Sequence, residues 1–167
     1  MNDSVVVPPR VSGRELVAVA ARWLLGGVLI YLGLSKTLHP VDFLKILRQY
    51  EMVDNHVVLN LIAAALPWFE IFCGLLLVCG IAVRGAALLS LAMLVPFTWI
   101  VWHRALAIRE AQAIPFCAVR FDCGCGVGEV LICRKLVENG LLILISGLLV
   151  VEQHRRWCLR YDLQKAG

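Results

Sequence analysis

The sequence predicts an all-α polytopic membrane protein: a four-transmembrane-helix bundle with one interfacial helix and one cysteine-rich loop. Hydrophobic residues make up 60% of the 167 residues and charged residues only 17%, whereas soluble domains are roughly 45 to 50% apolar. The apolar residues gather in about four long segments. Four of the seven cysteines lie in one polar segment between the last two of them. The length suits a single domain over residues 1–167, because domains typically run to roughly 100 to 200 residues.

The charge pattern favours a lipid bilayer as the partner and argues against nucleic-acid binding. The formal net charge is +4, and the basic residues lie at the ends of the apolar segments and in the tails, where they can anchor beside anionic headgroups. A nucleic-acid-binding domain would instead concentrate them on one face or helix. The polar stretch before residue 16 has neither the n-region nor the cleavage site of a signal peptide, so we expect a tail that is retained.

The first predicted span covers residues 16–34, about 19 residues or roughly 28 Å of helix. Only Arg22 interrupts it, and it ends near Lys36. Residues 40–53 then become amphipathic, which predicts a helix lying in the membrane interface. The residues expected to share its apolar face are Val41, Phe43, Leu44, Leu47 and Tyr50.

Three further spans are predicted after the interfacial helix. The second covers residues 57–80, with Pro67 and Glu70 near its middle, and a short link through Arg84 leads into the third, residues 85–102. A link this short predicts an antiparallel helical hairpin. The fourth span covers residues 136–151 and is followed by a basic tail.

Four spans place both chain termini on one side of the membrane and the two longer loops, 35–56 and 103–135, on the other. These loops are therefore expected to meet, and the interfacial helix is expected to cover or flank the cysteines. The adjacent Arg155 and Arg156 favour cytoplasmic termini in a bacterial inner membrane, although basic residues of the long loop, including Arg104 and Arg109, favour the opposite orientation.

Charged residues inside the spans are the first candidate functional residues, because a charge at a helix centre costs about 2.5 to 3.5 kcal/mol even on the lenient insertion scale. The estimated depths of Arg22 and Glu70 predict that they pair. A buried salt bridge that fixes helix register is favoured over a proton-transfer or quinone-site role. Lys36 and Glu138 lie at the same predicted membrane face, where either they pair or Lys36 snorkels and Glu138 is solvated.

The cysteines differ by location. Cys73 and Cys79 are six residues apart on one helix, so they point in different directions and are expected to be core packing. Cys158 belongs to the basic tail and, with cytoplasmic termini, is expected to stay a reduced thiol.

Cys117, Cys123, Cys125 and Cys133 share the long loop, and the Cys-Gly-Cys run within it is its most unusual feature. Glycine relaxes the backbone, so Cys123 and Cys125 can close a small, strained disulfide of the exchangeable kind. Cys117 and Cys133 then act as resolving or structural thiols. The alternatives are a pair of loop-stapling disulfides or, less favoured without a Cys-x-x-Cys spacing, a metal site.

Three groups of residues follow one family pattern in order and spacing: Arg22, Gly26, Gly33, Lys36 and Pro40 to Phe43 in the first part, Leu66, Pro67, Glu70 and Gly74 in the second, and Cys123, Gly124, Cys125, Gly126 and Asn139 in the last. On these residues the chain resembles the MauE branch of the DoxX-like membrane proteins over most of its length. The last element of the family is a Cys-Gly-Cys-Phe-Gly loop followed by a helix with an asparagine near its start. This chain lacks the phenylalanine, so its loop packing is expected to differ.

The resemblance implies a redox-associated membrane protein that supports thiol–disulfide exchange and the maturation of extracytoplasmic proteins, as in methylamine dehydrogenase maturation. It implies a thioredoxin-like extracytoplasmic partner, with another cysteine pair or a membrane quinone at the other end of the electron path. Two alternatives remain open. One is a non-catalytic accessory or assembly subunit of a larger membrane complex, and the other is a quinone-linked oxidoreductase subunit of the DoxX type.

Overall fold

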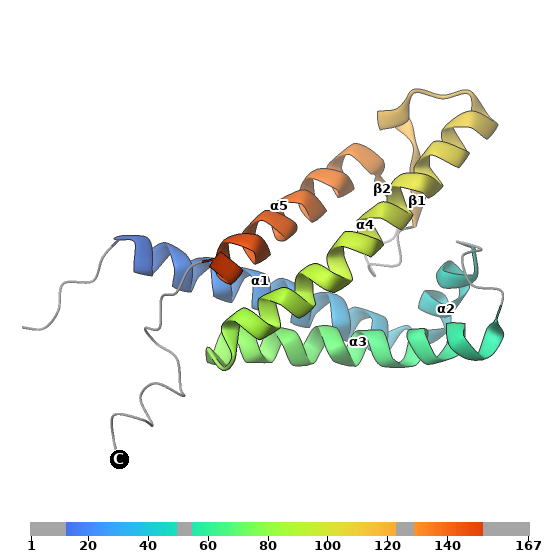
Figure 1. The fold of residues 1–167 in the computed structure, drawn as a ribbon. Helices are drawn as coiled ribbons and strands as arrows, with labels where there is room; N and C mark the ends of the chain where they lie inside the picture. Colours follow the sequence, from blue (N-terminus) through green and yellow to red (C-terminus); the bar gives the residue numbers. More distant parts are fainter. Residues whose placement is uncertain (1–12, 50–54, 123–128, 152–167) are drawn as a thin grey trace, which may run out of the picture.

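The computed structural model describes residues 13–49, 55–122 and 129–151, and these residues are mainly helical (Figure 1). Among them, α1, α3 and α4 are long and apolar enough to cross a membrane. In chain order the elements are α1 (Gly13–Leu38), α2 (Pro40–Gln49), α3 (His56–Cys79), α4 (Val83–Gln112), the 3-10 helix η1 (Phe116–Ala118), β1 (Arg120–Asp122), β2 (Glu129–Leu131) and α5 (Ile132–Val151).

The four longer helices form two pairs, α1 with α3 and α4 with α5 (Figure 1). The pairs lie close together at the end where α3 turns into α4, and Arg84 Nε donates to the Val150 carbonyl at 3.0 Å there. Toward the other end they diverge (Figure 1). The main core joins all four helices and consists of Leu25, Leu29, Cys73, Leu77, Ala86, Ala87, Leu94, Leu142 and Leu149.

Glycines let α1 and α3 approach each other closely. A Cβ built on Gly26 would lie 2.8 Å from the Gly74 carbonyl oxygen, and one built on Gly33 would lie 2.6 Å from the Pro67 carbonyl oxygen. Real Cβ atoms do not approach backbone this closely, so these contacts require glycine. They also fix the antiparallel register in which Gly26 faces Gly74 and Gly33 faces Pro67.

The turn between α3 and α4 is as short as the sequence predicts. Gly80 ends α3 in the left-handed conformation at φ 72°, and its N–H bonds to carbonyls of the last turn, which is the common glycine C-cap. Ala82 follows with φ 47°. Because so few residues join them, the two helices run antiparallel.

The long polar segment contains more regular structure than expected. The prediction that a loop begins at His103 is wrong, because the helix α4 continues to Gln112. Its apolar side is buried on both sides of the predicted end, because Val101 before it and Ala105 after it are both at 0% exposure. The helix stops at Ala113, which has φ 52°.

A small second core explains why α4 continues. After η1, the strands β1 and β2 pair antiparallel with Arg120 opposite Leu131, a hairpin that the sequence reading did not predict. Ile132 N–H then donates to the Val119 carbonyl at 3.1 Å. Together these elements cover the last turns of α4 around a buried cluster of Val101, Ala105, Val119 and Ile132.

The predicted fourth span corresponds to α5, which begins four residues earlier than expected. Its first turns carry Arg134, Lys135 and Glu138, so the apolar part is residues 139–151, about 20 Å of helix. The hydrocarbon core is about 30 Å thick. These three charged residues explain why α5 is not among the helices that are long and apolar enough to cross a membrane, and crossing by α5 remains a prediction.

The amphipathic helix α2, which the sequence predicts to lie in the membrane interface, packs mainly against α3 and less against α1. Phe43 and Ile46 are its buried residues, at 3% and 9% exposure. The predicted apolar face is therefore only partly right, because Val41 is 63% exposed and Ile46 takes its place. The predicted end of this helix at Val53 lies outside the described residues.

Candidate functional site between the helix pairs

A buried ion pair joins α1 to α3. Lys36 Nζ lies 2.5 Å from Glu70 Oε1, and the two residues are only 4% and 8% exposed. The predicted partner of Glu70 was Arg22, so that prediction is wrong. The expectation that a buried salt bridge would involve Glu70 is correct, with Lys36 as the cation.

The glycine contacts explain the change of partner. The register that sets Gly26 against Gly74 and Gly33 against Pro67 puts Arg22 level with Val78. Arg22 is therefore eight residues, or about 12 Å along the helix axis, from the level of Glu70. Depths counted from the sequence put the two residues closer, because they assumed that both helices end at the same plane. Arg22 is buried elsewhere on α1, at 4% exposure.

Aromatic rings from two other helices surround the Lys36 ammonium. Its Nζ lies 5.4 Å from the ring centre of Phe43 on α2 and 5.9 Å from that of Phe97 on α4. Both distances are within the range of cation–π attraction. Lys36 therefore contacts α2, α3 and α4 from its place in the last turn of α1, which makes it the junction of these helices.

The predicted pair of Lys36 with Glu138 is also wrong, while the alternative of a solvated Glu138 is closer. The Glu138 side chain is 44% exposed and accepts from Arg134 Nε at 2.9 Å on the same helix. Lys135 Nζ lies 4.0 Å from its other oxygen. Glu138 therefore pairs with basic residues in the first turns of its own helix, α5, and not with Lys36 of α1.

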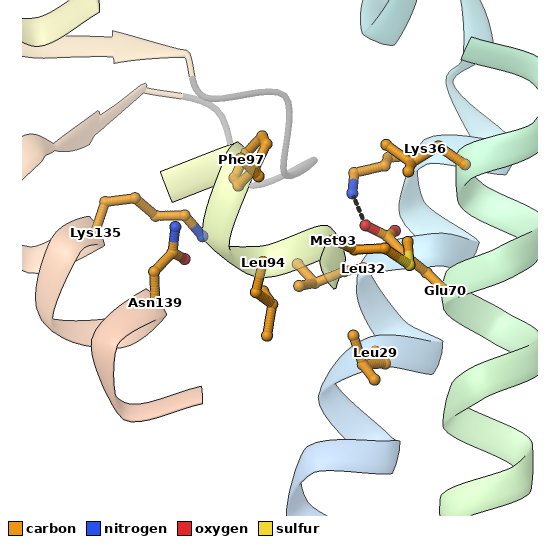
Figure 2. A pocket seen from close by; sticks show the side chains of 10 residues that line it. Leu29, Leu32, Lys36, Glu70, Met93, Leu94, Phe97, Lys135 and Asn139 are labelled. Atoms are coloured by element: carbon orange, nitrogen blue, oxygen red, sulfur yellow. Dashed lines mark hydrogen bonds and ion pairs between the residues drawn. The ribbon is translucent and has the colours of Figure 1, made fainter. Parts of the chain in front are cut away.

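A small cavity lies between the two helix pairs, at the level of the ion pair (Figure 2). Its volume is about 30 Å³, enough for one or two water molecules. Lys36 and Glu70 are at one side, and Lys135 and Asn139 of α5 are at the other (Figure 2). The remaining lining is apolar and consists of Leu29, Leu32, Leu66, Met93, Leu94 and Phe97.

Two of the polar lining residues, Asn139 and Glu70, differ in whether their side-chain atoms are hydrogen-bonded. Asn139 Nδ2 donates to Thr98 Oγ1 at 3.1 Å and so joins α5 to α4. Glu70 Oε2 is buried and has no hydrogen-bond partner among the described residues. Buried carboxylate oxygens without a donor are costly. Glu70 is therefore a cavity-lining residue with one buried oxygen that has no donor among the described residues.

The sequence reading found three of the four polar lining residues but missed Lys135. It treated Lys135 as a loop residue, yet it is 6% exposed in the first turn of α5. The available signal was its position three residues before Glu138 and four before Asn139, which puts all three on neighbouring helical positions.

A disulfide braces the hairpin at the same end of the molecule. Cys117 in η1 and Cys133 in the first turn of α5 are bonded, with 5.1 Å between their Cα atoms. One expected alternative was a pair of loop-stapling disulfides, and Cys117–Cys133 is one such bond, while the second stays a prediction. Cys123 and Cys125 lie outside the described residues, between the ends of β1 and β2 in the sequence. Cys133 and the cavity residue Lys135 are only two residues apart.

The other described cysteines are free thiols in different surroundings. Cys73 is 1% exposed and packs in the main core, as expected. Cys79 is exposed, so its assignment to the core is wrong. It lies at the end of α3, where the helix has passed its packed face. Cys158 lies outside the described residues.

The fold and the site together define a multi-pass helical membrane protein with a buried ion pair in an interhelical cavity and a disulfide-braced hairpin at one end. A family model described as methylamine utilisation protein MauE matches residues 14–152, which include all of these features. The chain therefore belongs to the MauE family, and this membership suggests a role in methylamine utilisation. No curated protein and no solved structure matches the chain.

Proposed function

We propose that the chain is a thiol–disulfide exchange protein of the bacterial inner membrane that supports the maturation of extracytoplasmic proteins. Its redox pair is Cys123 and Cys125, and its termini are cytoplasmic. The observation that carries the proposal is the Cys117–Cys133 disulfide. Structural disulfides persist in oxidising compartments, which supports an extracytoplasmic position for the segment that also contains the Cys-Gly-Cys run.

The Cys117–Cys133 disulfide suits a segment that must react with another protein. Cys117 and Cys133 are bonded to each other, so neither of these sulfurs is paired with a cysteine of the Cys-Gly-Cys run. Cys117 is exposed beside the hairpin. The disulfide ties η1 to α5 on either side of β1 and β2, which holds the base of the segment while Cys123 and Cys125 exchange.

The exchange is a two-electron reaction. A thiolate of the partner attacks one sulfur of the Cys123–Cys125 disulfide, which breaks that bond and forms a mixed disulfide. The second partner thiolate attacks the mixed disulfide, so the partner leaves oxidised and the chain keeps two thiols. Regeneration transfers two electrons and two protons from these thiols to the disulfide of a thioredoxin-like protein or to a membrane quinone.

Trapping of the mixed disulfide tests this function. In Cys125→Ser, the remaining Cys123 should hold a partner protein in a complex that survives denaturation and disappears on reduction. Maturation of the methylamine dehydrogenase small subunit should fall at least tenfold in Cys123→Ser, Cys125→Ser and the double variant. Cys79→Ser is the matched control, because Cys79 is an exposed thiol on α3 away from the hairpin.

The opposite result identifies the accessory-subunit alternative. If maturation survives in the Cys123→Ser, Cys125→Ser double variant but fails in Cys117→Ser, the cysteines serve only to hold a docking surface. The redox function is then wrong.

A further inference from the structure

One oxygen of the buried Glu70 carboxylate lacks a hydrogen bond. Lys36 Nζ donates to Oε1, but Oε2 has no partner among the described residues, although Glu70 is only 8% exposed. A buried acceptor without a donor loses the hydrogen bonds that it made in water. Glu70 lines the small cavity between the helix pairs (Figure 2). A molecule in this cavity that donates a hydrogen bond would therefore satisfy Oε2.

The size of the cavity limits its occupant. The cavity volume is about 30 Å³, and one water molecule needs about 10 to 15 Å³ of such space. The cavity therefore has room for one or two water molecules and none for an organic molecule with a ring or a chain.

The charges beside Oε2 disfavour an ion. Lys36 and Glu70 already form an ion pair, so a cation at Oε2 would lie beside the ammonium and an anion would lie beside the carboxylate. Lys135, on the other side of the cavity, has its Nζ 4.0 Å from Glu138 Oε2. A further buried ion would also lose its hydration without gaining a counter-charge of its own. A neutral molecule that both donates and accepts hydrogen bonds avoids these costs.

Lys36 supplies the second contact that such a molecule needs. A buried water typically makes about three hydrogen bonds, and a lysine ammonium carries three protons. One proton of Lys36 is donated to Glu70 Oε1, and both residues line the same cavity. A water beside the pair can therefore accept from Nζ and donate to Oε2.

We propose that the cavity holds an ordered water molecule that accepts a hydrogen bond from Lys36 Nζ and donates one to Glu70 Oε2. Ammonium, carboxylate and water then form one polar cluster inside the helix bundle, walled by leucine, methionine and phenylalanine side chains. The water completes the hydrogen bonding of the carboxylate that joins α1 to α3. The inference goes beyond the proposed function and does not depend on exchange at Cys123 and Cys125.

Crystals of the full chain grown in a lipid mesophase test the site directly. At a resolution that shows ordered water, we expect a peak of electron density within hydrogen-bonding distance of both Lys36 Nζ and Glu70 Oε2. Lys36→Met with Glu70→Leu removes both polar partners without stranding a charge. The cavity of this double variant should be empty, because apolar cavities stay dry. An empty cavity in the wild type, or the same peak in the double variant, would overturn the water site.

A cavity-filling substitution gives a second test in detergent solution. Displacing an ordered water by an apolar group loses its hydrogen bonds, whereas filling a dry space does not. Met93→Phe enlarges a side chain that lines the cavity. It should lower the unfolding temperature of the wild type by about 2 to 4 °C, and leave that of the Lys36→Met, Glu70→Leu variant unchanged or raised.

Ala92→Phe is the matched control, because Ala92 is the exposed neighbour of Met93 on α4. It should change the unfolding temperature equally in the two backgrounds. Equal effects of Met93→Phe in both backgrounds would mean that the substitution displaces no water, and the assignment would then be wrong. Neither experiment involves the cysteines, so both results are separate from the trapping experiment on Cys123.

Discussion

The buried carboxylate of Glu70 illustrates how a single residue depends on its partner. Removing two charges from water is costly, and their attraction offsets this cost only when the geometry is good and both groups remain. The contact between Lys36 Nζ and Glu70 Oε1, with two aromatic rings near the ammonium, meets this condition. Loss of one partner leaves the other buried and alone.

The first prediction follows from this asymmetry. Glu70→Leu or Lys36→Met alone should lower the free energy of unfolding by about 3 to 5 kcal/mol, whereas the double variant should lose much less. Thermal or denaturant unfolding in detergent measures all four proteins in one double-mutant cycle. Arg134→Ala with Glu138→Ala is the control cycle, because that exposed pair should couple by about 1 kcal/mol or less. Purely additive losses at Lys36 and Glu70 would contradict the pairing.

At the residue scale, the types of functional side chain were predictable and their partners were not. Glu70 was recognised because charges are rare in apolar segments, Lys36 because it closes the first apolar span, and Asn139 through the family resemblance. The partner of Glu70 was assigned to Arg22 because depth along one helix can be counted from the sequence. The offset between two helices is set by where their backbones touch, and that information is not in either segment alone.

At the scale of elements, the α1–α3 pair is organised by contacts between backbones. A Cβ built on Gly33 would lie 2.6 Å from the Pro67 carbonyl oxygen and 3.1 Å from the Cβ of Glu70, so the two backbones are in close contact here. Close approach at small residues is a main source of helix association in membranes. The same contact brings the last turn of α1, with Lys36, to the carboxylate.

The second prediction tests this contact with two glycines on one helix. Gly33→Ala places a methyl group 2.6 Å from the Pro67 carbonyl oxygen, so the helices must separate, and the free energy of unfolding should fall by about 1 to 3 kcal/mol. Gly27→Ala is the matched control, because nothing lies within 4 Å of the added group and the change should be neutral or stabilising. Equal effects of the two substitutions on the unfolding transition would refute a close contact at Gly33.

Polar residues near the end of α4 caused the sequence to predict too short a helix. His103 and Arg104 follow the apolar run, so the sequence indicates a membrane exit. The helix nevertheless continues, because Val101, Ala105 and Ile108 lie on the side that the hairpin covers. That cover comes from residues about 15 to 30 positions later in the sequence, and the hairpin strands themselves are only three residues long.

At the scale of the whole molecule, two helix pairs share one packed end and separate toward the other (Figure 1). The disulfide-braced hairpin lies at the divergent end (Figure 1). The main core joins all four helices, and the small cavity with its ion pair lies between the two pairs.

The third prediction concerns membrane topology. If α5 crosses the membrane, the N-terminus and the C-terminus lie on the same side, and both are expected in the cytoplasm. Green fluorescent protein fused to the C-terminus should then fluoresce, and alkaline phosphatase at the same place should be inactive. A phosphatase fusion within the hairpin segment should be active. Active phosphatase both in the hairpin segment and at the C-terminus would mean that α5 does not cross, leaving three spans, whereas activity at the C-terminus alone would reverse the predicted orientation.

The sequence by itself determined the class of protein, the approximate positions of its long helices and three of the four polar residues that line its site. These follow from local physics: apolar runs of sufficient length form spans, short links form hairpins, and charges in apolar surroundings require partners. Tertiary structure decided that Glu70 pairs with Lys36, that Lys135 enters the cavity and that Cys117 bonds to Cys133. Each of these depends on the relative offset and tilt of separate helices. Backbone contacts such as that between Gly33 and Pro67 set this offset, and no single segment contains it.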